Sequence, residues 1–173
     1  MRDEKQLSIL YLHGLESKLS EQKRFVLERF GTVISPDLNY YENNKIFESL
    51  ITLIKNETID VIIGSSMGGF MGFHLAKTCN IPSLLFNPAL SWQPVRQELN
   101  LKKFTQQQSP KVQIVLGKLD CTVNPDDTLK WLDENQKMQA NTQIKIQNNM
   151  EHQIPLAVFE EEIIHFFGYF FDS

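Results

Sequence analysis

The sequence predicts an α/β fold, with a three-layer, doubly wound, mostly parallel sheet of about six strands. Short apolar runs alternate along the chain with longer segments whose apolar residues recur at helical spacing. The short runs are also apolar nearly throughout, which is typical of parallel strands that helices cover on both faces. At 173 residues we expect a single domain over 1–173, with one short cap-like excursion at 88–110.

The strands and helices are expected in alternating order. The predicted strands are Leu7–Leu12, Thr32–Ser35, Asp60–Gly64, Ser83–Phe86, Lys111–Gly117 and Gln143–Gln147. Helices are predicted over 20–30, 43–56, 67–79, from Asn124 onward and over 155–171, the last with Phe159, Ile163, Phe166 and Phe170 facing a core. Ser20 is a plausible N-cap for the first helix, and Asn124-Pro125 begins the fourth in the favoured manner.

Composition and charge exclude several classes of protein. The chain is 42% hydrophobic and 22% charged, and its net charge of −4 includes no basic stripe, which argues against nucleic-acid or anionic-membrane partners. No segment approaches the ~18 apolar residues of a membrane span, and "MRDEKQ" lacks the apolar stretch of a secretory signal. Cys79 and Cys121 make neither a disulfide framework nor a metal cluster. We expect a cytoplasmic protein, either a monomer or a small homo-oligomer.

One stretch, "DVIIGSSMGGF", places small residues directly between a predicted strand and a predicted helix. It fits neither phosphate motif, because Phe70 stands where a P-loop needs lysine and Ser66 where a dinucleotide fingerprint needs glycine. A packing stripe of Gly68, Gly72 and Ala76 explains the glycines but not the serine. The pattern G-x-S-x-G in this position is typical of a nucleophile elbow, with Ser66 as the nucleophile.

An activated serine needs a histidine base and an acid that orients it. In folds with this elbow the acid and then the histidine follow the serine, on loops after later strands. Asp120 directly follows the fifth predicted strand, and His152 follows the sixth. Asp126 is the alternative acid, although Asp126 and Asp127 are better explained as acids at a helix N-terminus.

The other three histidines are weaker candidates for the base. His74 and His165 lie inside predicted helices, and His13 precedes the serine in the chain. His13 instead belongs to His13-Gly14-Leu15, which follows the first strand. At this place the fold supplies an oxyanion donor, so we expect the backbone N–H groups of Leu15 and Met67 to form the hole. The alternative is that His13-Gly14 only ends the strand. Candidate substrate-binding residues are Leu90, Trp92 and Ile154.

With these residues assembled, the chain resembles the compact bacterial serine esterases of the YqiA/YcfP type, within the α/β-hydrolase superfamily. The matching segments are "YLHGLES", "SEQK", "GSSMGGF", "FNPAL", "GKLD" and "EHQI". The resemblance implies a minimal α/β-hydrolase fold that hydrolyses short acyl esters or thioesters without metal or organic cofactor. It assigns nucleophile, acid and base to Ser66, Asp120 and His152. The sequence "NNMEHQIP" departs from the family pattern, which tends to have glycine before the histidine and an aromatic residue soon after it.

Four functional hypotheses follow. The favoured one is a serine hydrolase that cleaves short-chain carboxylic esters through an acyl-enzyme intermediate, and an acyl thioesterase would use the same triad. The third is a non-catalytic interaction protein on a hydrolase fold, which is disfavoured because degraded homologues usually lose a triad member. The fourth is a peptidase, which is weakened by the lack of any sizeable domain to select a peptide.

Overall fold

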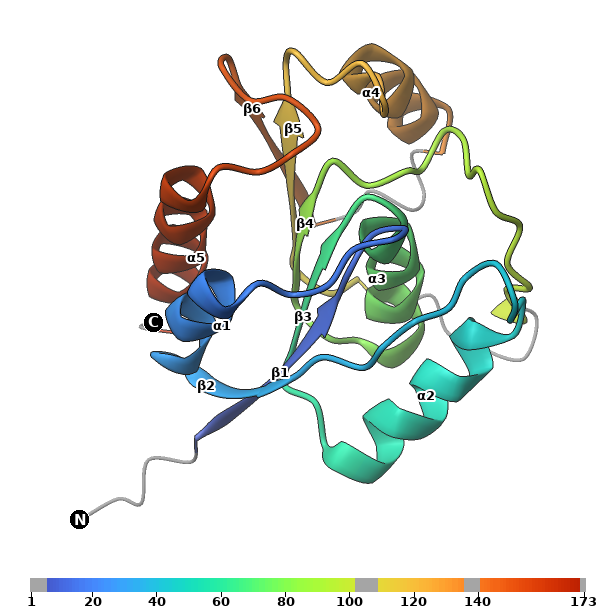
Figure 1. Ribbon diagram of the computed structural model, residues 1–173, viewed down its shortest axis with the longest axis vertical. Coiled ribbons are helices and arrows are strands. Elements are labelled where there is room, and N and C mark those ends of the chain that lie inside the picture. The colour runs from blue at the N-terminus through green and yellow to red at the C-terminus, as the bar shows by residue number, and fades with distance from the viewer. Residues whose placement is uncertain (1–5, 102–108, 136–140, 172–173) are drawn as a thin grey trace.

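Six parallel strands form one sheet in the order β2-β1-β3-β4-β5-β6. The computed structural model in Figure 1 describes residues 6–101, 109–135 and 141–171. The strands are β1 Leu7–Leu12, β2 Gly31–Ile34, β3 Val61–Ser65, β4 Ser83–Phe86, β5 Val112–Gly117 and β6 Thr142–Gln147. The predicted doubly wound fold is therefore confirmed, and each strand lies within one residue of its expected bounds.

Helices cover both faces of the sheet, as Figure 1 shows. The helices are α1 Glu21–Glu28, α2 Ile46–Glu57, α3 Met67–Cys79, α4 Pro125–Glu134 and α5 Leu156–Phe171. Alternate residues of β1 belong to different cores. Ile9 and Tyr11 pack with the apolar faces of α1 and α5, and Leu10 and Leu12 with those of α2, α3 and α4. The strands are thus buried on both sides, which explains their nearly continuous apolar sequences.

Local hydrogen bonds set the helix boundaries. The Ser20 hydroxyl accepts a bond from Lys23 N–H at the start of α1, and the Asn124 side chain accepts one from Asp126 N–H before Pro125. Both caps are those that the sequence predicted. Helix α2 begins at Ile46 rather than at residue 43, because the Asn43 side chain accepts the backbone N–H of Lys45 and holds a turn there.

The small residues of α3 allow this helix to lie directly on the sheet. A Cβ atom on Gly68 would collide with the carbonyl oxygen of Leu12, and one on Gly72 would lie 2.8 Å from Leu85 Cδ2. The packing explanation of the stripe is therefore correct for the glycines, and it leaves the adjacent serine to be explained.

Some expectations fall outside the described residues. They concern part of the 88–110 excursion, including Gln106 to Gln108, and the core contact expected of the Phe170 side chain. The described residues of the excursion, 88–101 and 109–110, are irregular, and the first of these ranges begins at the carboxyl end of β4. Within residues 6–101, 109–135 and 141–171, none of the helices is long and apolar enough to cross a membrane.

Candidate active site

Ser66 occupies a strained turn between β3 and α3. Its backbone φ of 53° and ψ of −118° are unusual for a residue with a side chain. The turn is held because Ser66 N–H donates to Phe86 O at 3.0 Å and Ala89 N–H donates to Ser66 O at 3.1 Å. A Cβ atom on Gly64 would lie 2.5 Å from Gly68 O, so the position before the turn requires glycine. This geometry is that of a nucleophile elbow.

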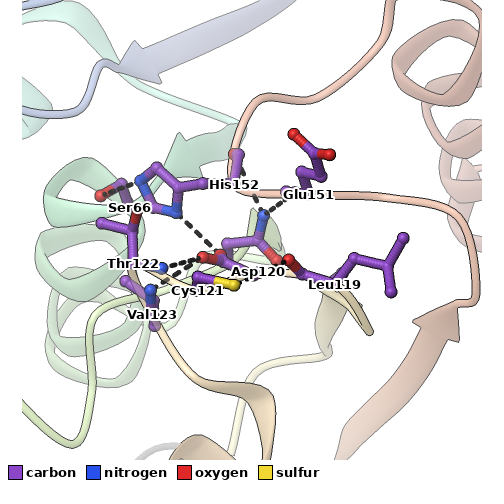
Figure 2. A network of polar contacts seen from close by, with 10 residues as sticks. Ser66, Leu119, Asp120, Cys121, Thr122, Val123, Glu151 and His152 are labelled. Atoms are coloured by element: carbon purple, nitrogen blue, oxygen red, sulfur yellow. Dashed lines mark hydrogen bonds and ion pairs between the residues drawn. The ribbon is translucent and has the colours of Figure 1, made fainter.

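A continuous chain of hydrogen bonds joins Ser66, His152 and Asp120 (Figure 2). Nδ1 of His152 lies 2.7 Å from Oδ2 of Asp120, and Nε2 lies 3.0 Å from Oγ of Ser66. Because the carboxylate can only accept, Nδ1 carries the proton and Nε2 accepts the serine hydroxyl. The three residues follow β3, β6 and β5, whose carboxyl ends meet at the same edge of the parallel sheet.

Asp120 is fixed on both carboxylate oxygens. Its Oδ1 accepts backbone N–H bonds from Thr122 and Val123, each at 2.8 Å, while Oδ2 faces His152. The residue is 3% exposed, so its orientation is set by these bonds rather than by solvent. The alternative acid, Asp126, instead lies in the first turn of α4, as expected for an acid at a helix N-terminus.

Asn87 is a buried polar residue of this site that the sequence reasoning missed. Its side-chain nitrogen donates to the carbonyl oxygens of Glu151 and His152 at 3.1 and 3.2 Å, and its oxygen accepts Gly117 N–H at 2.7 Å. It therefore ties the end of β4 to the loops after β5 and β6. The available signal was its position, since "FNPAL" places an asparagine directly after an apolar strand at this edge.

The other loop beside Ser66 is His13-Gly14-Leu15, after β1. A Cβ atom on Gly14 would lie 3.1 Å from Ser66 Cβ, so the backbone passes directly against the serine. His13 is buried, and its Nδ1 donates to Gly14 O at 2.6 Å while Nε2 accepts Leu38 N–H at 2.9 Å. Both ring nitrogens are thus occupied in holding the loop.

Tyr40 also holds this loop, because its hydroxyl donates to His13 O at 2.9 Å. Burial raises the pKa of Tyr40, so the hydroxyl keeps the proton that it donates. Met67 directly follows Ser66 as the first residue of α3, where a backbone N–H has no partner within the helix.

Ser66 and His152 open into a cavity of about 710 Å³, named here the Ser66 cavity. Two of the expected substrate-binding residues, Trp92 and Ile154, line it, as does Leu15. Leu90 does not, because it is 1% exposed and packs in the core on the α3 side of the sheet. In the described parts of the chain, no group of three or more His, Cys, Asp or Glu residues is placed to hold a metal ion.

Comparison with known proteins identifies the family. Residues 8–148 match the group described as "Uncharacterised protein family (UPF0227)". The chain belongs to this family. The match confirms the family resemblance that the motifs indicated, and the structures described next show that this UPF0227 protein has the fold of α/β hydrolases. No curated protein matches the UPF0227 chain in sequence.

Solved structures share the fold of this UPF0227 protein. A monoacylglycerol lipase from Paleococcus ferrophilus aligns with a TM-score of 0.70 at 12% identity, over 91% of this chain and 92% of that one. The mouse alpha/beta hydrolase domain-containing protein 10 aligns at 0.70 and 13% identity, over 95% and 89%. Est1E from Butyrivibrio proteoclasticus with bound ferulic acid aligns at 0.72 and 14%, over 96% and 90%. At such identities the similarity establishes the fold.

Proposed function

We propose that this protein is a serine hydrolase that cleaves carboxylic esters through an acyl-enzyme intermediate. One observation carries the proposal: the hydrogen-bond chain from Ser66 through His152 to Asp120, which ends at an open cavity. A serine without a catalytic role needs neither a strained backbone nor a histidine aligned on its hydroxyl. A nucleophile uses both, because the strained turn exposes its hydroxyl and the histidine accepts the hydroxyl proton.

The reaction follows from the hydrogen-bond directions. As Ser66 Oγ attacks the ester carbonyl, its proton passes to Nε2 of His152, and the buried Asp120 carboxylate stabilises the imidazolium. His152 then gives this proton to the leaving alcohol, and Ser66 is left acylated. Water, deprotonated by the same histidine, attacks the acyl-enzyme and releases the acid, which returns Ser66 to its hydroxyl form.

The negative charge that develops on the carbonyl oxygen needs donors on the side away from His152. The backbone N–H groups of Leu15 and Met67 fit this role, since Leu15 lies on the loop beside Ser66, and Met67 directly follows Ser66 with a backbone N–H that is not used within α3. The hydrogen bond from His13 Nδ1 to Gly14 O would keep the Leu15 N–H in position before substrate binds. Losing one such donor typically lowers the rate about 100- to 1000-fold.

We further propose that the acyl group is short. The Ser66 cavity has apolar lining from Ala89, Pro94 and Val123, but Trp92 at its side is 63% exposed. Beneath the serine, Met67 is completely buried in the core, so the acyl chain has no apolar tunnel there to enter. A cavity with this lining is suited to an acyl group of a few carbons rather than to a fatty-acid chain.

The direct test is labelling with a fluorophosphonate probe, which phosphonylates activated serines. We expect one modified residue, Ser66, identified by mass spectrometry of the labelled peptide. Labelling should disappear in Ser66→Ala and persist in Ser65→Ala, a matched change one residue earlier on the same strand end. An unlabelled wild-type protein that is fully folded would contradict the proposal and favour a non-catalytic interaction protein.

A further inference from the structure

The Ser66 cavity has two chemically different sides. The segments after β4 and β5 contribute apolar residues, among them Ala89, Trp92 and Val123. The segment after β1 and the start of α1 contribute Ser17, Ser20 and charged residues. In the sheet, β1 and β4 are the two neighbours of β3, which carries Ser66, so these segments flank the serine from opposite sides.

Lys23 is the partly buried charged residue on the polar side of the cavity. Glu16 and Lys18 also line the cavity, but both are exposed, and Lys18 Nζ pairs with Asp37 at 3.1 Å. Lys23 is half-buried, and among the described residues no carboxylate forms an ion pair with its ammonium group within 4 Å. Its Nζ is held 5.2 Å from the centre of the Phe159 ring in α5.

This environment leaves the ammonium group partly desolvated. Burial lowers the pKa of Lys23, the direction expected when water is removed from a cation and no anion replaces it. A negative group on a bound molecule would supply the missing partner, and beside a half-buried ammonium group such a pair is stronger than on a fully exposed surface. The aromatic face of Phe159 contributes a weaker attraction that also fixes where the cation lies.

We propose that the Ser66 cavity selects esters that carry a carboxylate or phosphate on the side of the α1 helix, with Lys23 as the counter-ion. This inference rests on the proposed esterase function and narrows its substrate class. The substrate would then have an apolar part against Trp92 and Val123, a scissile ester at Ser66 and an anionic part at Lys23. Lys23 determines specificity in this arrangement and takes no part in the proton transfers.

Matched ester pairs test the proposal on either side of the scissile bond. For the acyl side we would compare the p-nitrophenyl monoester of glutaric acid with p-nitrophenyl pentanoate, which has a methyl group in place of the carboxylate. For the alcohol side, 4-carboxybenzyl butanoate is compared with benzyl butanoate. In at least one pair the wild type should prefer the anionic ester by about tenfold or more in kcat/KM, and added salt should reduce that preference.

Variants assign the preference to one side chain. Lys23→Met should lower the anionic-to-neutral ratio of kcat/KM by about tenfold or more, and Lys23→Arg should retain most of it. Lys77→Met is the matched control, because Lys77 also lies over a phenylalanine, 5.7 Å from the Phe73 ring centre, but does not line the cavity. This control should leave the ratio unchanged.

The outcomes separate the inference from the function on which it rests. Equal kcat/KM within both ester pairs, or the same ratio in wild type and Lys23→Met, would overturn the role of Lys23 while fluorophosphonate labelling of Ser66 stands. If Lys23→Met fails to fold, the salt dependence of the wild-type ratio and the Lys23→Arg variant still decide the matter. Failure to hydrolyse any of the four esters, together with no labelling, would overturn both proposals.

Discussion

Asn87 shows how one side chain can align a site that three separate loops build. It is 1% exposed, its φ is 43°, and its amide binds the carbonyl oxygens of Glu151 and His152 and the N–H of Gly117. The amide needs both its donor and its acceptor for these bonds, so neither aspartate nor an apolar residue can replace it. Because His152 lies on one of these loops, a small shift there changes the distance from Nε2 to the serine.

We predict that Asn87→Ala lowers kcat by about 10- to 100-fold with little change in KM. A displaced histidine reduces the stabilisation of the transition state more than it reduces the affinity for substrate. Stability should fall by about 2–4 kcal/mol, since buried backbone groups lose their partners. Steady-state kinetics with urea denaturation checks both numbers, and the rate of fluorophosphonate labelling should fall with kcat.

Asn80→Ala is the control for the cost of placing alanine in a left-handed backbone conformation, which Asn87→Ala also incurs. Asn80 also has a left-handed conformation, with φ of 57°, but it ends α3 and is exposed. Its replacement should cost about 1 kcal/mol of stability and leave kcat unchanged. Wild-type labelling kinetics in folded Asn87→Ala would mean that the asparagine is purely structural.

Helix α3 begins directly after the strained turn at Ser66 and contains a buried histidine. His74 contacts Phe70, Phe73 and Trp131 edge to face, and among the described residues its Nδ1 has no hydrogen-bond partner. Burial lowers the pKa of His74 to about 4, from an ordinary value of 6.5. This histidine is therefore a neutral core residue, as its helical position in the sequence suggested.

The burial of His74 makes the free energy of unfolding of the protein dependent on pH. Between pH 6.5 and about 4 the unfolded chain binds a proton at His74 that the folded protein does not, so stability falls as pH falls through this window. The contribution of His74 to the free energy of unfolding should decrease by ~2 kcal/mol between pH 7 and pH 4.5.

Urea denaturation of wild type and His74→Leu at both pH values measures this contribution. The variant should lose about 2 kcal/mol less than wild type on acidification, whereas His165→Leu, at an exposed position of α5, should behave as wild type does. If the free energy of unfolding changes equally with pH in wild type and His74→Leu, then His74 binds its proton in the folded protein as readily as in the unfolded chain, which would contradict the prediction.

At the scale of the whole molecule, the described residues form no helix or strand that covers the Ser66 cavity on its open side. The carboxyl edge beside Ser66 is bordered by loops and by the irregular segment after β4, of which residues 88–101 and 109–110 are described. Trp92, from this segment, stands largely in solvent at the side of the cavity.

We therefore predict that kcat/KM is highest for acyl chains of about two to six carbons. Each buried CH₂ contributes about 0.8 kcal/mol, and carbons that remain in water add nothing to transition-state binding. Hydrolysis of p-nitrophenyl esters from acetate to palmitate measures the profile, with and without a lipid interface as the control for interfacial activation. A steady increase in kcat/KM up to palmitate would contradict the short-chain proposal.

The sequence by itself determined the fold and the order of its elements. Apolar runs, helical spacing and the caps at Ser20 and Asn124 depend on neighbours along the chain, and they placed the strands to within one residue. The sequence also selected Ser66, Asp120 and His152, because in a parallel sheet every residue that directly follows a strand reaches the same edge.

The tertiary structure decided what sequence order leaves open, namely which of these edge residues touch. It placed Asp120 rather than Asp126 on the histidine, put Leu90 in the core instead of on the cavity wall, and brought Asn87 and Lys23 to the site. The physical reason is that periodicity and capping are local, whereas side-chain contact depends on the twist of the sheet, the paths of its loops and the packing of α1 on α5. Those relations join residues far apart in sequence, such as Lys23 and Phe159, and no local pattern records them.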